Sequence, residues 1–151
     1  MVRKTPGHST AFVYRDALWH GADMFGTGVA SFGHVHGVHL QNLDRWDDYM
    51  AAVLDRGELP LNRALPVTDG QRLIREMVLQ LKTGRLDAAA FRQKFGADIL
   101  SEFADGWRTM ADRGLLTVHD DRVELTPDGF LEVDRHLPLF FEPQFRGARY
   151  T

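Results

Sequence analysis

The chain has 151 residues, of which 44% are hydrophobic, so it can bury one core and at most one further small subdomain. Its formal net charge is -3 at pH 7, which leaves no overall positive field to attract nucleic acid or an anionic membrane surface. It contains no cysteine, which excludes disulfides, thiolate metal sites, a cysteine nucleophile and a cysteine-ligated iron–sulfur cluster within this chain.

The residues after Met1 are basic, but no apolar run follows them that could form the core of a signal peptide. No stretch approaches the roughly 20 apolar residues that a membrane-spanning helix needs. We therefore expect a soluble, cytoplasmic protein.

The first part of the chain, up to about Asn42, is rich in glycine and holds five of the seven histidines. Short apolar runs at residues 12–15 and 24–32 predict buried strands, and the glycines in the second run suit a close approach of backbones. Three histidines then gather at residues 34, 36 and 39, where flanking glycines favour a loop. If this segment were a strand, His34 and His36 would share one face and His39 would lie on the other.

Helical periodicity predominates from Asp44 onward. Asp44 is predicted to cap a helix that ends near Gly57, and residues 58–66, which include two prolines, are interpreted as a linker. Thr68 and Gln71 form a capping box, which predicts a helix that Gly84 ends.

The remaining predicted elements follow in a regular order. They are a short helix from Asp87 to Gly96, a longer helix from Asp98 to Gly114, a β-hairpin that turns on Asp120 and Asp121, and a helix that begins at Thr126 and Pro127 and ends at Pro138. This order is the winged-helix arrangement. The predicted fold class is α+β and mainly helical, with a winged-helix-like domain over residues 44–151 after a strand and loop segment over residues 1–43.

These patterns favour some kinds of functional site over others. The helix from Asp98 to Gly114 carries more acidic than basic residues and would repel phosphate, which favours a packing or protein-binding winged helix over a DNA-binding one. The histidine cluster lacks a companion carboxylate at a defined spacing, so it predicts no metal site; a haem ligand and a polar loop at the mouth of a cavity stay open. Gly26 and Gly28 begin a dinucleotide fingerprint, but the third glycine is missing and no helix follows.

Four segments in the first part of the chain together resemble a known family. They are Tyr14–Trp19, Asp23–Ser31, Gln41–Asn42 and Tyr49, and they resemble the end of the radical SAM barrel in oxygen-independent coproporphyrinogen III oxidases and their haem-chaperone-like relatives. Later segments are similar to the C-terminal helical domain of that family: Arg72–Glu76, Leu79–Leu81, Phe91, Phe95–Gly96, Gly114–Leu116 and Leu125–Gly129.

The resemblance implies that residues 1–43 are a terminal strand segment of a radical SAM-type barrel. It implies that residues 44–151 are a C-terminal domain that helps to enclose a tetrapyrrole-like substrate in porphyrin metabolism. The family uses S-adenosylmethionine and a four-iron four-sulfur cluster. Because this chain has no cysteine to hold the cluster, we expect no cofactor, no metal, no catalytic residue and no catalysis in the chain alone.

By the same resemblance, Gly26, Gly28 and Ser31 border the S-adenosylmethionine site. His34, His36 and His39 would lie near the substrate or a haem.

Strands taken out of a barrel leave unpaired edges, which predicts a partner for the first segment. We expect either a barrel domain that carries the cluster or a homodimer formed through the exposed strands, together with a tetrapyrrole-like small molecule. Nucleic acid and membrane are not expected as partners. Two other functions stay open, namely a haem- or tetrapyrrole-binding protein that uses the histidine loop, and a winged-helix module that binds protein or DNA.

Overall fold

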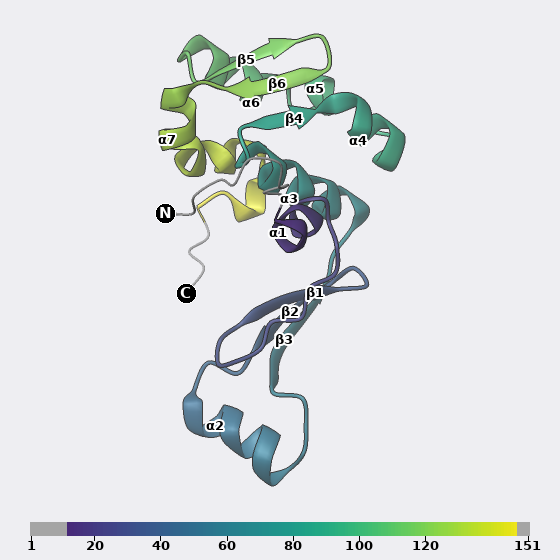
Figure 1. Ribbon diagram of the computed structural model, residues 1–151, viewed down its shortest axis with the longest axis vertical. Helices are drawn as coiled ribbons and strands as arrows, with labels where there is room; N and C mark the ends of the chain where they lie inside the picture. Colours follow the sequence, from purple (N-terminus) through teal and green to yellow (C-terminus); the bar gives the residue numbers. More distant parts are fainter. Residues whose placement is uncertain (1–11, 148–151) are drawn as a thin grey trace, which may run out of the picture. The chain divides into compact units, whose positions relative to one another are not determined.

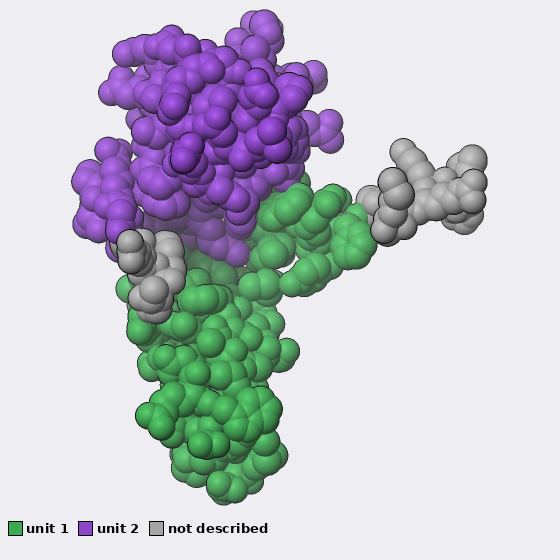
Figure 2. Space-filling view, turned by 90° about the vertical axis from the view of Figure 1, so that its left-hand side faces the viewer, with its two compact units in different colours: residues 1–67 green, residues 68–151 purple. Residues whose placement is uncertain are grey.

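The chain forms two compact units, residues 1–67 and residues 68–151, in a computed structural model that describes residues 12–147 (Figure 2). Helices occupy about half of the described residues, and the strands form two small antiparallel sheets. The expected mixture of helix and sheet is therefore confirmed. The units divide after Val67 and not after residue 43, because a strand over residues 61–66 pairs with an earlier strand and keeps these residues in the first unit.

The first unit is a three-stranded sheet with short helices attached (Figure 1). Its elements are α1 (Val13–Trp19), β1 (Phe32–Val35), β2 (Val38–Asn42), α2 (Trp46–Met50), a π-helical segment (Ala51–Asp55) that continues α2, and β3 (Leu61–Pro66). The strand order is β1-β2-β3, so β3 is an outer strand, and none of the described strands pairs with its second edge. All six of its residues are exposed.

Two predicted strands of the first unit are wrong. Residues 12–15 were expected to be a buried strand, but they lead into α1, and Tyr14 is 65% exposed. Residues 24–32 contribute a single bridge, between Met24 and His34, before β1 begins at Phe32. The positive φ angles of Gly28 (102°) and Ala30 (58°) explain this, because they turn the chain out of the extended conformation that a strand requires.

The linker predicted at residues 58–66 is also wrong, because it contains β3. Pro66 is the last residue of that strand, and an outer strand tolerates proline because no neighbour needs its N–H on the open side. The helix predicted after Asp44 is present, but Asp44 does not cap it. The N-cap residue is Arg45, which makes no side-chain capping bond.

The second unit packs helices on another three-stranded sheet. Its elements are α3 (Asp69–Leu81), β4 (Arg85–Asp87), α4 (Ala88–Phe95), α5 (Ile99–Glu102), α6 (Ala104–Asp112), β5 (Leu116–His119), β6 (Arg122–Leu125), α7 (Pro127–His136) and two 3-10 turns (Leu137–Phe140 and Pro143–Phe145). The strand order is β4-β6-β5, and both pairings are antiparallel.

Three of the predicted helix ends of this unit are confirmed. The Thr68 hydroxyl accepts a hydrogen bond from the Gln71 backbone N–H, and the Gln71 side chain accepts one from the Thr68 N–H, which completes the capping box. The Thr126 hydroxyl accepts from the Gly129 N–H and so begins α7. Gly96 ends α4 in the left-handed conformation, with φ of 70°.

Two details of this unit differ from prediction. The short strand β4 lies where the sequence suggested only the end of one helix and the start of the next. The helix predicted from Asp98 to Gly114 is broken at Phe103, whose backbone has φ of -112° and ψ of 28°, into α5 and α6.

The hydrophobic core belongs to the second unit. Among residues 12–147, every buried apolar side chain except Ala52 lies between Leu73 and Phe140. Trp107 contributes to this core, because its ring packs against Phe140 with centroids 4.3 Å apart and its indole N–H donates to the Ile99 carbonyl at 2.8 Å. Among residues 12–147, no helix is long and apolar enough to cross a membrane.

Candidate functional site

A glycine loop, which we define as residues 26–31, leads into β1 and is held by two side chains from further along the chain. The Asn42 amide nitrogen donates to the carbonyl oxygens of Gly26 (3.0 Å) and Gly28 (2.9 Å). The Gly28 N–H donates to the Tyr49 hydroxyl at 3.1 Å. Asn42 is 8% exposed, so its two hydrogen bonds are shielded from water. These contacts give the glycine loop one fixed backbone conformation.

The absence of a side chain at Gly26 has a local cause. A Cβ at this position would lie 2.1 Å from the Phe32 carbonyl oxygen, far inside van der Waals contact. The backbone at Gly26 therefore packs directly against the backbone of Phe32 in β1. From the sequence, a cofactor or a substrate was expected to lie against this glycine. Contact with the Phe32 backbone is thus sufficient to explain why residue 26 is glycine. The role of Gly26 toward S-adenosylmethionine stays a prediction.

The other two residues predicted to border that cofactor also lie in the glycine loop. Gly28 has φ of 102°, which side chains disfavour. The Ser31 hydroxyl donates to the Thr27 carbonyl at 2.8 Å, and the Ser31 carbonyl accepts from the Asn42 N–H at 2.9 Å. Gly26, Gly28 and Ser31 thus share one loop whose hydrogen bonds described above are made within the first unit, and their place beside S-adenosylmethionine stays a prediction.

The three histidines predicted to form a loop lie instead on a β-hairpin. His34 is in β1, His39 is in β2, and His36 with Gly37 forms the two-residue turn between them. Both turn residues have positive φ (49° and 74°), which is the combination that matches the twist of a hairpin. His34 pairs directly with His39, so these two share a face, and the predicted sharing of a face by His34 and His36 is wrong.

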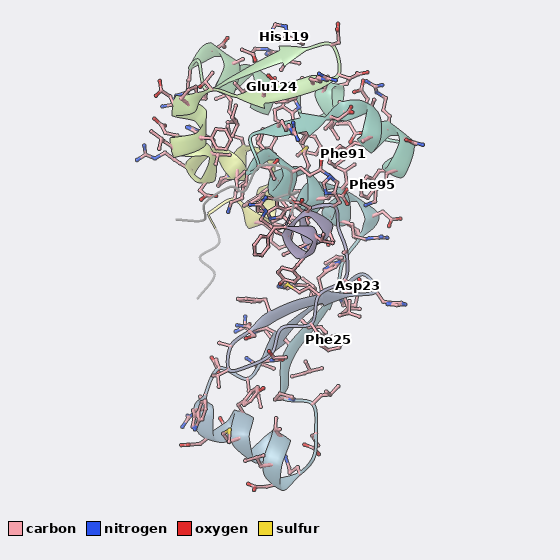
Figure 3. The ribbon with its side chains drawn as sticks, in the orientation of Figure 1. Asp23, Phe25, Phe91, Phe95, His119 and Glu124 are labelled. Carbon is pink, nitrogen blue, oxygen red and sulfur yellow. The ribbon has the colours of Figure 1, made fainter. Side chains whose placement is uncertain are left out.

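Each of these histidines has its own surroundings. His34 is 4% exposed, and His39 is half-buried with its ring stacked on Phe32 at a centroid distance of 5.5 Å. The His36 side chain is 91% exposed. The Asp23 carboxylate lies at the turn of this hairpin (Figure 3), where it accepts from the His36 backbone N–H at 3.0 Å and lies 3.2 Å from His36 Nδ1.

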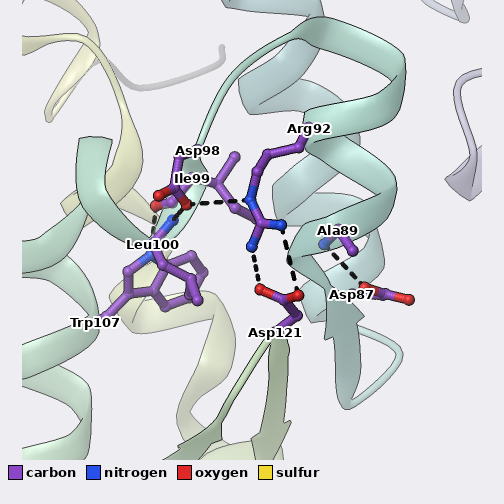
Figure 4. Close-up of polar contacts among 8 residues, drawn as sticks. All are labelled: Asp87, Ala89, Arg92, Asp98, Ile99, Leu100, Trp107 and Asp121. Carbon is purple, nitrogen blue, oxygen red and sulfur yellow. Dashed lines mark hydrogen bonds and ion pairs between the residues drawn. The ribbon is translucent and has the colours of Figure 1, made fainter.

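The second unit has a polar cluster of its own, centred on Arg92 of α4 (Figure 4). The Arg92 guanidinium pairs with the Asp121 carboxylate in the turn between β5 and β6, and lies 3.8 Å from the Asp98 carboxylate that caps α5. The hydrogen bond to Asp121 raises the pKa of Arg92 above its usual value. This cation ties α4, α5 and the hairpin together, and it is engaged within the unit.

A metal ion would find no cluster of ligands in the part of the chain that the structure describes. No group of three or more histidine, aspartate or glutamate side chains there could hold one. The chain also has no cysteine to supply a thiolate.

Comparison with known proteins finds a family that the second unit resembles. Residues 67–131 match the family described as the HemN C-terminal domain, and they begin at the boundary between the two units. Most of the second unit is thus similar to the HemN C-terminal domain. The family resemblance that the sequence predicted is thereby confirmed.

Curated relatives match beyond the HemN C-terminal domain. The chain is 30% identical to the oxygen-independent coproporphyrinogen III oxidase of Pseudomonas aeruginosa, over 83% of this chain and 30% of the relative. It is 28% identical to the Helicobacter pylori protein of the same name, over 82% of this chain and 27% of the relative. The heme chaperone HemW of Bacillus subtilis is 26% identical, over 75% of this chain and 30% of the relative. The chain thus spans less than a third of the length of these relatives.

A solved structure shares the fold. The structure of coproporphyrinogen III oxidase (HemN) from Escherichia coli, described as a radical SAM enzyme, aligns with 78% of this chain and 28% of its own length. The TM-score is 0.65 and the sequence identity is 22%. The fold similarity therefore extends beyond the HemN C-terminal domain into the first unit.

Sequence reasoning named Asn42, Tyr49 and Asp23 within the resembling segments but gave them no role. Asn42 lies 14 and 16 residues from the glycines that it holds, and Asp23 lies 13 residues from His36. No local spacing rule links residues this far apart along the chain. The sequence shows only that Asn42 and Asp23 are polar residues at the edges of a glycine-rich segment. That position does not indicate which residues their side chains bind.

Proposed function

We propose that this chain is the C-terminal, substrate-enclosing part of a coproporphyrinogen III oxidase-like radical SAM protein in porphyrin metabolism, and that it is not catalytic alone. The observation that carries the proposal is that the first unit has almost no hydrophobic core of its own. That unit has an outer strand with an open edge and, among the described residues, Ala52 as its one buried apolar side chain. A sheet of three short strands with so little core gains little stability by itself.

The surface of the first unit supports a covering partner. Large apolar side chains are exposed along it: Phe12, Val13, Tyr14, Phe25, Phe32, Trp46, Val53, Leu54, Leu59, Leu61 and Leu65. Monomeric proteins rarely leave this much apolar surface in water, and such surfaces mark sites of association. The relatives are more than three times as long as the aligned region, so the partner that we propose is a barrel domain that corresponds to their remaining length.

The cofactors of such a protein would be held largely by that partner. S-adenosylmethionine and a four-iron four-sulfur cluster are expected by family, and this chain, without cysteine, supplies no cluster ligand. Gly26, Gly28 and Ser31 would form a backbone wall beside S-adenosylmethionine, positioned by Asn42 and Tyr49. The second unit would close over a tetrapyrrole-like substrate.

The order of elements supports a winged-helix description of the second unit as part of this proposal. α3, β4, α4, the α5–α6 pair, β5 and β6 follow one another in the winged-helix order, with β6 between β4 and β5 in the sheet. Two of the cations that a DNA-binding version could use are paired with carboxylates, Arg92 with Asp121 and Arg108 with Asp105. Protein contact is the use that we propose for this unit.

The test begins with the gene. The region upstream of the Met1 codon is read for an in-frame segment with closely spaced cysteines, and that segment is produced as a separate chain. We expect it to form a one-to-one complex with this chain in analytical ultracentrifugation, and to slow hydrogen exchange in β3 and in the glycine loop. A homodimer of this chain that the segment does not dissociate would contradict the proposal, as would a complex that leaves exchange in the first unit unchanged.

A second function is favoured by one specific observation, the pairing of His36 with Asp23 on an exposed hairpin. We propose as this alternative a haem- or tetrapyrrole-binding protein that uses the histidine hairpin. Its support from the comparisons is the match to a protein named as a heme chaperone. Titration of the chain with hemin, followed by absorbance in the Soret region, tests it, and the absence of any Soret shift would exclude it.

A further inference from the structure

The chain continues past the part that matches the HemN C-terminal domain, and this continuation packs back onto the second unit. The match ends at residue 131, within α7. Among the later residues, Val133, Leu137 and Phe140 are buried in the core. The core of the second unit therefore includes side chains that the matched family does not cover.

The segment that follows Phe140 is held by polar contacts as well. We call it the C-terminal strap and define it as residues 141–147. The Arg146 guanidinium donates to the carbonyl oxygens of Phe141 at 2.9 Å and Leu139 at 3.4 Å, which bends the strap back toward its own beginning. Phe141 packs against the core. The strap therefore follows one defined course along the unit.

Glu142 of the C-terminal strap reaches the start of α3, 71 residues earlier in the chain. The Gln71 side-chain nitrogen donates to Glu142 Oε2 at 2.9 Å, and the Gln144 side-chain nitrogen donates to the same oxygen at 3.0 Å. An ionised carboxylate only accepts hydrogen bonds, so it receives the nitrogen end of the Gln71 amide and not the oxygen end.

The orientation of that amide decides whether the capping box is complete. With its nitrogen on Glu142, Gln71 directs its oxygen to the Thr68 N–H, which donates to it at 3.1 Å. If the amide turned over, two N–H groups would face each other and the Thr68 N–H would lose its acceptor. Thr68 is the first residue of the second unit, directly after Val67. Glu142 thus acts on the backbone at which the second unit begins.

We propose that the C-terminal strap is a conformational device that fixes the residue at which α3 begins, and that Glu142 is its positioning residue, acting through the Gln71 amide. A carboxylate beside the N-terminus of a helix is also favoured by the helix dipole. When the strap is released, the Thr68 N–H opens to water while the rest of α3 stays helical. This device is independent of the functions proposed above, so either can fail while the other stands.

The first experiment compares three substitutions at position 142 of the full chain. Glu142→Gln keeps an acceptor oxygen for Gln71, Glu142→Ala removes it, and Glu142→Lys puts a donor in its place. Hydrogen exchange at the Thr68 N–H is measured by NMR spectroscopy. We expect no change in Glu142→Gln, an acceleration of about fivefold in Glu142→Ala, which corresponds to one ordinary hydrogen bond, and an acceleration of about tenfold in Glu142→Lys.

The Gln71 side-chain amide gives a spectroscopic signature of the same event. Its two N–H resonances should stay in place in Glu142→Gln and move in Glu142→Lys, because the lysine ammonium accepts no hydrogen bond and instead attracts the amide oxygen. A chain that ends at Phe140 lacks the whole strap and should match Glu142→Ala at Thr68. Urea denaturation of each variant checks that the core stays folded.

Two matched controls lie close to the same contact. Gln144→Ala removes the other hydrogen bond to Glu142 and leaves that of Gln71 in place. Arg72→Ala breaks the ion pair with Asp69, at 3.1 Å, in the same turn of α3. Neither substitution should change exchange at Thr68.

Two results would overturn the proposal. Equal exchange at Thr68 in the original chain, Glu142→Ala and Glu142→Lys would show that the strap does not fix the start of α3. A merely structural role for Glu142 would fray the whole first turn, so exchange at the Gln71 N–H, which donates to the Thr68 hydroxyl, would rise as much as at Thr68. That outcome would overturn the assignment of Glu142 as a positioning residue.

Discussion

Gly129, near the start of α7, is fixed by the backbone of another segment. A Cβ at this position would lie 1.8 Å from the Leu115 carbonyl oxygen. Alanine is favoured over glycine inside a helix by about 1 kcal/mol, but this clash is with backbone, which cannot rotate away. We expect Gly129→Ala to lower the free energy of unfolding by about 1–3 kcal/mol, as overpacking of an interior does. Urea denaturation of the full chain measures it.

Gly70 provides the matched control, because it also lies in the first turn of a helix. The nearest atom to a Cβ at Gly70 is the Thr68 hydroxyl oxygen at 3.9 Å, an ordinary contact. Gly70→Ala should therefore leave stability unchanged or raise it slightly. Equal effects of the two substitutions would show that helix propensity, and not the approach to Leu115, decides the result at Gly129.

Asn42 is the residue on which the conformation of the glycine loop depends. Replacing it with alanine leaves the carbonyl oxygens of Gly26 and Gly28 without their side-chain donor, and a buried acceptor that loses its partner costs about 1–3 kcal/mol. We expect Asn42→Ala to speed hydrogen exchange in residues 26–31 by the corresponding factor. Asn62→Ala, on the exposed strand β3, should leave that exchange unchanged. Unaltered protection in Asn42→Ala would mean that the loop does not depend on this amide.

At the scale of elements, α3 and α4 are joined by an ion pair that is buried on one side. Lys94 Nζ lies 2.6 Å from Glu76 Oε2, and Gln80 donates to the other oxygen of Glu76. The Glu76 side chain is 6% exposed and that of Lys94 is 46% exposed. Glu76 therefore depends on Lys94 for its countercharge, while water screens part of the attraction from the open side.

Lys94→Met removes that countercharge and keeps most of the side-chain volume. We expect the free energy of unfolding to fall by about 1–2 kcal/mol, less than the 3–5 kcal/mol typical of a fully buried pair, because Lys94 is half exposed. Adding Glu76→Gln should recover part of the loss, because it removes the uncompensated charge. Two losses that simply add in the double variant would contradict this coupling.

The sequence predicts a helix end or a turn correctly where a few neighbouring residues determine it. The capping box of Thr68 and Gln71, the Thr126 and Pro127 start of α7 and the turn at Asp120 and Asp121 are local signals, and the structure contains each of them. β4 is only three residues long and exists because β6 pairs with it, so no periodicity could reveal it.

The first unit was harder to predict because its elements depend on distant partners. β3 forms next to β2 although prolines occupy positions 60 and 66, and a proline-rich segment usually indicates a linker. The glycine loop was placed with Asn42 and Tyr49 by family resemblance, but their hydrogen bonds join residues 14 to 21 positions apart. The pairing of Asp23 with His36 has no signature in the sequence at all.

At the scale of the whole molecule, stability and exposed surface are divided between the units. The second unit holds the core, and the first unit holds most of the exposed large apolar side chains that the structure describes. We expect a fragment of residues 68–151 to unfold cooperatively, with a Tm within about 5 °C of the main transition of the full chain, a shift worth roughly 1 kcal/mol in a domain of this size. Differential scanning calorimetry of both proteins measures it.

A fragment without a cooperative transition would show that the core needs the first unit for its stability. Hydrogen exchange of the full chain gives an independent check. Amides of α3 and β6 should exchange far more slowly than those of β3, because local opening is easiest where few apolar contacts are buried.

The open edge of β3 also decides how this protein behaves at high concentration. An unpaired strand invites the same strand of another molecule, and the growth of such pairs leads to aggregation. Between Leu61 and Pro66, Arg63 is the one charged residue, and Pro66 is the one residue that cannot donate a backbone hydrogen bond. A charge and a missing N–H both disfavour the pairing of one strand edge with another, so Arg63 and Pro66 oppose the association of β3 with β3 of a second copy.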